Sequence, residues 1–275
     1  MLRTALFALV SIGIMHGAHA AGKRDNPMKP SETWEELRVD VVGDREILDG
    51  SDLLEIDAPY RAHDAAVVPI TVREKEGSDK DFVKLTIVID ENPAPVAAEF
   101  EFGPAYGDLD METRMRVNAY SNVRALAETK DGDIYMVGKF VKASGGCSAP
   151  AMKDADAAMA SIGKMKLRFF DPAEASEPSS GTRREAQIML RHPNNSGLQM
   201  NQVTQLFIPA WFVDEVEVMQ GDQMVMKMTG GISISEDPSF RFKYIENGAG
   251  TLTVRAKDTE GEVFEKDFPT TPTES

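Results

Sequence analysis

A single cysteine is the sharpest chemical feature of this 275-residue chain. Cys147 follows two glycines, in the order Gly145-Gly146-Cys147. Glycine has no side chain and reaches backbone angles that other residues avoid, so this pair favours a loop that can move. The thiolate of a cysteine is a nucleophile. The segment predicts a solvent-reachable thiol on a swinging arm, with Cys147 as the covalent attachment point and Gly145 and Gly146 as the source of flexibility.

Few other side chains could assist this thiol in catalysis. His63 lies in a polar turn sequence, and His192 precedes Pro193 in another turn. A nucleophilic cysteine with a histidine base is therefore a weak hypothesis here. Two of the four histidines lie within residues 1–20, which we expect to be removed, so the cysteine with His63 and His192 makes at most an incomplete transition-metal site. We expect no catalytic residue, no metal site and no cofactor.

Four methionines leave one alternative open. Met224, Met226 and Met228 alternate along a predicted strand, and Met219 lies nearby. Thioethers are soft ligands that suit Cu(I), so a copper chaperone is conceivable. The same alternation is typical of a methionine-filled core or interface, and this second interpretation has the stronger support.

The N-terminus predicts export. Arg3 is followed by the apolar run 4–15 and by Ala18-His19-Ala20, which together have the pattern of a signal peptide over residues 1–20. The apolar run is too short to span a bilayer. We therefore expect a periplasmic protein. Cysteines in that oxidising compartment usually form disulfides, but a single cysteine has no internal partner.

The charge balance argues against two classes of partner. The formal net charge is −15, and the lysines and arginines are scattered singly. Such a chain repels nucleic acid and anionic membrane surfaces. We expect it to bind neither.

The elements that must hold the cysteine are mainly strands. Residues 21–30 are a loose, disordered lead-in, and a short helix follows, with capping-box spacing from Thr33 to Glu36. Beyond it, the apolar residues recur with a period of two, which predicts β-strands. Asp108 to Glu112 is interpreted as a solvated turn. The predicted strands are 66–72, 83–89, 96–102, 113–117, 123–129, 134–141, 165–170, 186–191, 212–219, 224–228, 240–245, 251–256 and 263–268.

One segment divides this series of strands. Residues 171–184 contain almost no apolar side chain larger than alanine and predict a flexible linker. The chain is therefore expected to be all-β, with one β-sandwich over 31–170 and a second over 185–275.

Both predicted domains resemble subunits of a known sulfur carrier. Residues 58–72, together with the Gly-Gly-Cys segment, are similar to SoxY, the sulfur-carrier subunit of the periplasmic thiosulfate-oxidising system. His192-Pro193 with Gly197, and the stretch 237–242, are similar to its partner SoxZ. The fused order resembles SoxYZ-like carrier proteins associated with quinoprotein dehydrogenases.

The resemblance implies two immunoglobulin-like sandwiches that pair within one chain. It also implies that Cys147 holds a sulfur-containing intermediate for periplasmic redox enzymes, either Sox-type enzymes or a quinoprotein dehydrogenase with its cytochrome c. SoxY arms typically end just after the cysteine, whereas here Ser148-Ala149-Pro150 and a second domain follow. We therefore expect a loop tethered at both ends.

Three functions compete at this point. The first is a covalent carrier and not an enzyme. The second is a non-covalent accessory that docks to an alcohol dehydrogenase dependent on pyrroloquinoline quinone. The third is the methionine-based copper chaperone.

Overall fold

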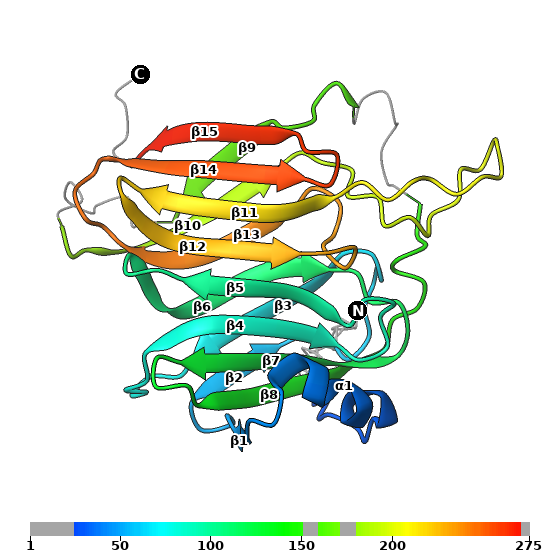
Figure 1. Cartoon of the computed structure of the whole chain (residues 1–275), viewed down its shortest axis with the longest axis horizontal. Coiled ribbons are helices and arrows are strands. Elements are labelled where there is room, and N and C mark those ends of the chain that lie inside the picture. The colour runs from blue at the N-terminus through cyan, green and yellow to red at the C-terminus, as the bar shows by residue number, and fades with distance from the viewer. Residues whose placement is uncertain (1–24, 151–158, 171–179, 271–275) are drawn as a thin grey trace, which may run out of the picture.

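Two β-sheets packed face to face form this protein (Figure 1). A computed structural model describes residues 25–150, 159–170 and 180–270. The helix α1 (Glu32–Val42) is the one long helix in these ranges, and no helix there is long and apolar enough to cross a membrane. The predicted all-β class with a short N-terminal helix is confirmed.

The strands fall into two groups along the chain. The N-terminal half holds β1 (Ile47–Asp49), β2 (Leu54–Asp57), β3 (Val68–Glu74), β4 (Phe82–Ile89), β5 (Val96–Phe102), β6 (Tyr106–Met115), β7 (Ser121–Thr129) and β8 (Ile134–Val141). The C-terminal half holds β9 (Met165–Phe169), β10 (Arg183–Leu190), β11 (Val213–Gln220), β12 (Gln223–Gly230), β13 (Ser239–Ile245), β14 (Thr251–Asp258) and β15 (Val263–Pro269).

The two halves join edge to edge in both layers. The larger sheet has the order β1-β8-β7-β4-β5-β12-β11-β14-β15, and the smaller has the order β2-β3-β6-β13-β10-β9. β5 pairs antiparallel with β12, and β6 pairs antiparallel with β13. Each half thus covers the exposed strand edge of the other. The predicted pairing of two sandwiches within one chain is confirmed, in the form of two continuous sheets.

One apolar core runs through this junction. Phe100 on β5 and Phe240 on β13 are both buried, and their rings meet edge to face with centroids 5.9 Å apart. Met226 and Met228 on β12 belong to the same buried cluster. Because these contacts link strands of both halves, neither half buries its core alone.

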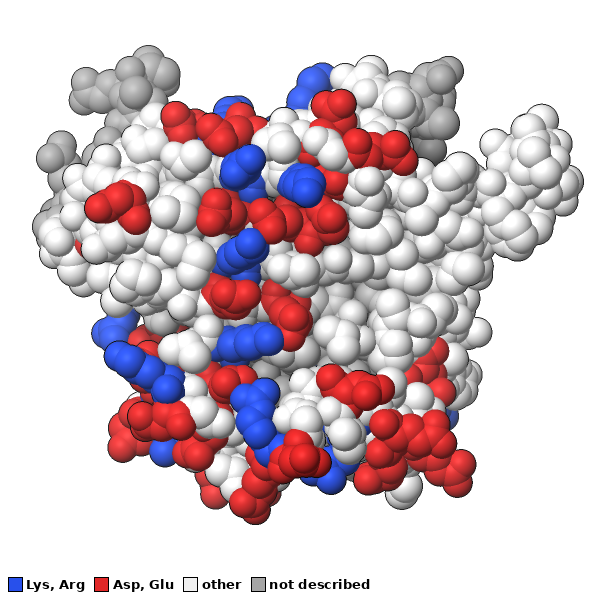
Figure 2. Space-filling model, in the orientation of Figure 1, with Lys and Arg blue, Asp and Glu red and all other residues white. Residues whose placement is uncertain are grey.

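The outer face of the larger sheet carries opposite charges across the junction. Lys84 and Lys227 both lie opposite Glu101, and Glu217 lies between Lys227 and Arg255. Figure 2 shows a column of positive and negative side chains down this face. Exposed pairs of this kind contribute little stability, so the column keeps the face polar and the buried core holds the halves together.

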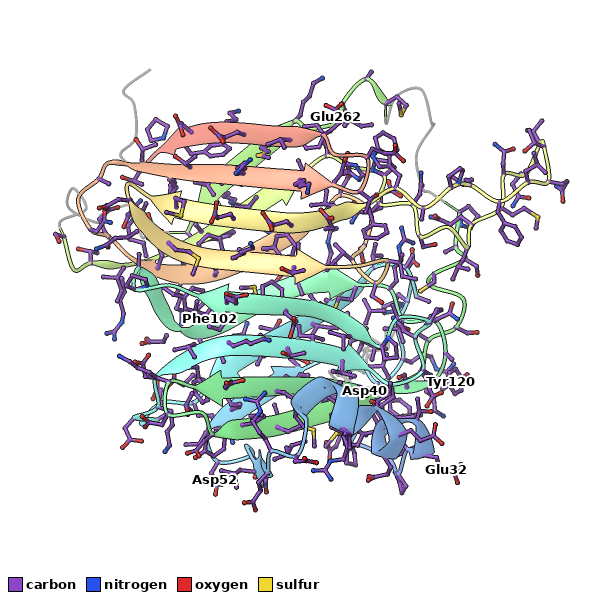
Figure 3. All side chains as sticks on the ribbon, in the orientation of Figure 1. Glu32, Asp40, Asp52, Phe102, Tyr120 and Glu262 are labelled. Atoms are coloured by element: carbon purple, nitrogen blue, oxygen red, sulfur yellow. The ribbon has the colours of Figure 1, made fainter. Side chains whose placement is uncertain are left out.

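The helix α1 packs on the far end of the N-terminal half. Ser31 caps it by accepting a hydrogen bond from the Trp34 backbone, so the predicted capping box at Thr33 is wrong by two residues. Trp34 and Val42 are buried against Leu126. Figure 3 places the labelled Glu32 and Asp40 on this helix, well away from the junction near Phe102.

Two strand assignments differ from expectation. The run Asp108 to Glu112 is the middle of β6, because Leu109 and Met111 alternate into the core. The strand β9, predicted within the first sandwich, pairs with β10 and so lies in the C-terminal half. Residues 1–24, which include the expected signal peptide, and 171–179 of the expected linker lie outside the described residues.

The shared core predicts one cooperative unfolding transition for both halves. Phe100→Ala should lower the free energy of unfolding by about 3–5 kcal/mol, the usual cost of removing a buried phenyl ring. The chain has two tryptophans, Trp34 in one half and Trp211 in the other. In Trp34→Phe and Trp211→Phe backgrounds, urea unfolding followed by fluorescence should show one transition each, and Phe100→Ala should shift both midpoints by the same amount.

Val39→Ala is the matched control, because Val39 is an exposed apolar residue on α1. It should change the midpoint little. A midpoint shift by Phe100→Ala in one background and not in the other would contradict the single core.

Candidate functional site

Residues 143–150, here called the cysteine loop, follow directly after β8. The backbone is fixed at the start of the loop. The Lys142 N–H donates to the Tyr60 carbonyl at 2.8 Å, and the Ala62 N–H donates to the Lys142 carbonyl at 3.1 Å. Any movement of the thiol must therefore begin after Lys142.

The centre of the loop is a tight turn. The Ser148 N–H donates to the Gly145 carbonyl at 3.1 Å, and Gly145 has a φ of 76°. That angle is strained for residues with a side chain. The Gly145 N–H also donates to the Asn118 carbonyl at 2.7 Å. Gly145 is therefore needed for the shape of the turn.

Gly146 meets a different requirement, which is close packing. Its N–H donates to the Val117 carbonyl at 3.2 Å. A Cβ atom at this position would lie 2.1 Å from the Ala65 carbonyl oxygen and 2.6 Å from that of Val117. Only glycine permits this approach of three backbone segments. In this packed arrangement, here called the docked loop, the geometry requires glycine at both positions. The role of the two glycines as a hinge stays a prediction.

Cys147 is fully buried, with none of its surface exposed. Its N–H donates to Asn118 Oδ1 at 3.3 Å, and its carbonyl accepts a hydrogen bond from Ser196 Oγ of the C-terminal half. The expectation of a solvent-reachable thiol is therefore wrong for this structure. The turn directs the side chain inward because the backbone around it is bound on both sides.

Arg116 is the charged group closest to this arrangement. The guanidinium is buried, and it donates to the Gly146 carbonyl at 3.1 Å and to the Asn194 carbonyl at 3.2 Å. It forms no ion pair within the described residues, and its Nε has no hydrogen-bond partner there. Arg116 thus fastens the cysteine loop to both halves through uncharged acceptors.

The surroundings keep the thiol protonated. Burial raises the pKa of Cys147 above its ordinary value, and the positive charge of Arg116 offsets this only in part. Burial likewise lowers the pKa of Arg116. The thiolate is the reactive form of cysteine. The docked Cys147 is therefore a poor nucleophile.

The other candidate residues do not join Cys147. His63 is exposed in its turn, whereas His192 is buried with its Nε2 3.4 Å from Asp258 Oδ2. Burial lowers the pKa of His192. No hydrogen bond links either histidine to the thiol within the described residues. Met226 and Met228 lie in the core, which supports packing as their role. In the described ranges, no three potential ligands among His, Cys, Asp and Glu side chains converge on one point.

Three residues of the site were not predicted from the sequence. Arg116, Asn118 and Ser196 hold the loop, yet they come from connections between strands and from two different halves. The sequence does contain a sign of Arg116's role, because a charged residue at the apolar end of a predicted strand needs a partner once it is buried. Nothing in the sequence indicated which backbone groups these side chains would meet.

Two family models match different parts of the chain. The family model described as "Sulfur oxidation protein SoxY" matches residues 38–147, and that described as "Sulphur oxidation protein SoxZ" matches residues 173–269. The SoxY match ends on Cys147. No curated protein sequence gave a match.

Solved structures that are similar to part of the chain include a carrier protein. It is the sulfur carrier protein SoxY from Chlorobium limicola f thiosulfatophilum, with 24% sequence identity and a TM-score of 0.35. The alignment covers 40% of this chain and 91% of that one.

The burial of Cys147 predicts an unusual pH dependence of its alkylation. The docked loop favours the protonated thiol. The stabilisation of the docked loop is therefore complete below the ordinary thiol pKa of about 8.5, and it declines as pH rises toward the raised pKa. The alkylation rate with a maleimide should therefore keep rising about tenfold per pH unit beyond pH 8.5. An exposed cysteine, measured as Cys147→Ser/Ser144→Cys, should level off there. Equal plateaus for both proteins would contradict the docked thiol.

The packing of Gly146 predicts the effect of adding one methyl group. Gly146→Ala places a Cβ against the Ala65 carbonyl and should displace the cysteine loop while leaving both sheets folded. Alkylation of Cys147 at pH 7 should then accelerate at least tenfold, which corresponds to about 1.4 kcal/mol of lost docking energy. Ser144→Ala, an exposed change in the same loop, is the control and should leave the rate unchanged. An unchanged rate in Gly146→Ala would contradict the contact.

Proposed function

This chain belongs to the Sox carrier family as a fusion of a SoxY domain with a SoxZ domain, and from that premise we propose that Cys147 is its cargo-bearing residue. SoxY and SoxZ are carrier and partner proteins, not catalysts, so the chain is a Sox-type sulfur-oxidation carrier and not an enzyme. The single observation that supports Cys147 is its position: it is the one cysteine of the chain, and the SoxY match ends on it.

Loading requires an oxidation that the chain cannot perform alone. In the proposed step, Cys147 loses its proton to solvent, and its sulfur forms an S–S bond with the outer sulfur of thiosulfate. Two electrons leave to an oxidising partner of the cytochrome c class, and no other bond breaks. The product is an anionic S-thiosulfonate on Cys147, which a partner enzyme can process further.

The buried thiol means that carrier function needs two positions of the cysteine loop. Five hydrogen bonds hold the docked loop: three donated by the N–H groups of Gly145, Gly146 and Cys147, and two accepted from Arg116 and Ser196. At about 0.5–1.5 kcal/mol each, undocking costs about 2.5–7.5 kcal/mol. The undocked fraction at rest is then about 10⁻² to 10⁻⁵.

The docked position suits the unloaded protein. A protonated and enclosed thiol resists unwanted oxidation in an oxidising compartment. Cys147 has no free surface at which a thiosulfonate could be added without moving the loop. Loading and undocking are therefore coupled in this proposal, and the glycines supply the backbone freedom once the packing against Ala65 is released.

We propose that the protein works in the periplasm after removal of residues 1–20. The partners are redox enzymes of that compartment, either Sox-type enzymes or a quinoprotein dehydrogenase with its cytochrome c. Support comes from the pattern of the leader and from the family. The oxidised cargo also requires an electron acceptor, which a cytochrome provides.

The burial of Cys147 favours a second candidate function. A thiol that never leaves its site would make the chain a non-covalent accessory, with the joined sandwiches acting as a docking surface for a quinoprotein. The two functions differ in whether Cys147 ever carries an adduct.

Intact mass of the protein isolated from periplasm tests the carrier function. Cells are grown on thiosulfate or on an alcohol, and the mass is measured before and after a reductant. A reducible adduct should appear in one of these conditions, be absent from Cys147→Ser, and identify the pathway by the growth substrate. Ser144→Ala controls for changes at an exposed residue of the same loop.

The contradicting result is a free thiol under both conditions together with a Cys147→Ser strain that grows normally. That outcome would leave the accessory function as the explanation.

A further inference from the structure

Residues 195–211 form a projection from the C-terminal half, here called the finger. It leaves the sandwich between β10 and β11 and is the yellow segment that extends to the right in Figure 1. Its two limbs pair with each other. Asn195 and Trp211 exchange backbone hydrogen bonds at 2.8 and 2.9 Å, and the Ile208 N–H donates to the Gln199 carbonyl at 2.8 Å.

The tip of the finger exposes large apolar side chains. Val203 is 91% exposed, Leu206 is 68% exposed and Phe207 is 65% exposed. Single exposed apolar residues are ordinary, but three within five positions on a projecting segment are typical of an interaction site.

The finger also lacks charge in a strongly charged protein. The run from His192 to Val213 contains no Lys, Arg, Asp or Glu and is the longest such run in the chain. Figure 2 shows the projection free of red and blue, in contrast to the rest of that face. This signal is readable in the sequence once the exposure of the segment is known.

The root of the finger is rigid and touches the cysteine loop. The Trp211 indole Nε1 donates to Asp258 Oδ2 at 2.8 Å, and the buried His192 packs edge to face on Trp211 with ring centroids 5.0 Å apart. On the other limb, Ser196 Oγ donates to the Cys147 carbonyl and the Ser196 N–H donates to Gln199 Oε1 at 2.8 Å. The finger and the thiol are therefore mechanically connected.

We propose that the finger is the docking element for the enzyme that processes the cargo on Cys147. The occupant is a partner protein with an uncharged, apolar recess beside the entrance of its active site. A second copy of this chain is disfavoured because each copy carries a charge of −15, and an anionic membrane surface is disfavoured by the same repulsion. The recess would take Val203, Leu206 and Phe207.

Docking at the finger also gives the partner a means of releasing the thiol. A partner that moves the limb bearing Ser196 removes the hydrogen bond to the Cys147 carbonyl. That bond joins the finger directly to the cysteine loop. Recognition and undocking would then occur in the same encounter. This inference rests on the carrier function proposed above.

Steady-state kinetics with the loaded protein as substrate tests the proposal. The full chain carrying a thiosulfonate on Cys147 is offered to a periplasmic Sox enzyme that discharges the wild-type chain. The variant Leu206→Ser/Phe207→Ser should raise KM for the loaded protein at least tenfold and leave kcat unchanged. Val39→Ser, an exposed apolar change on α1, is the matched control and should leave KM unchanged. Equal urea midpoints for the variant and the wild type establish that the fold is intact.

Three other results would overturn the docking role of the finger. Discharge of the wild type and the finger variant with equal KM overturns the docking role while the carrier function stands. A wild-type chain that no Sox enzyme discharges overturns the carrier function and the inference with it. Dimerisation in light scattering, or flotation with phosphatidylglycerol vesicles, that is lost in the finger variant would assign the finger to a second copy or to a membrane and overturn the proposal.

Discussion

The pairing of β5 with β12 and of β6 with β13 is the constraint on which the site depends. It makes two sandwiches into two continuous sheets with one core, so the loops at one end of both halves have fixed relative positions. Backbone groups near the junction then find partners across it. The Arg116 N–H donates to the Ser233 carbonyl at 2.7 Å, and Ser235 Oγ donates to the Ala66 carbonyl at 2.7 Å. The cysteine loop is held in the same way, by Asn118 from one half and Ser196 from the other.

Burial of the cysteine loop protects the thiol from oxidation and at the same time prevents it from accepting cargo. A buried polar group is stable only if it is hydrogen-bonded, and the loop satisfies this with backbone acceptors and a guanidinium. The same bonds that make the docked state stable make it unreactive, because they enclose a thiol whose pKa is raised. A carrier with this resting state is inert between encounters. It becomes reactive only when a partner supplies interactions that favour the undocked loop.

The sequence predicted the strands well, because apolar periodicity determines them. It predicted the position of the thiol poorly, because contacts between the two halves determine that position. Alternation of apolar residues located most strands. The run Asp108 to Glu112 is an exception, because its acidic residues conceal the alternation of Leu109 and Met111. The thiol's position was missed because Gly-Gly is compatible with both mobility and close packing. Only the approach of the Ala65 carbonyl to Gly146 distinguishes the two.

The free energy that undocks the cysteine loop and the free energy gained by burying the finger tip in a partner are of similar size. Coupling of docking at the finger to release of the thiol requires this. Undocking costs about 2.5–7.5 kcal/mol from its hydrogen bonds. Burying the side chains of Val203, Leu206 and Phe207 in a partner yields about 1.5–3 kcal/mol each before the cost of association. A partner that bound the finger without moving Ser196 would gain this energy and leave the thiol enclosed. The connection through Ser196 therefore decides whether binding energy at the finger becomes access to Cys147, because a ligand shifts an equilibrium only by its difference in affinity for the two states.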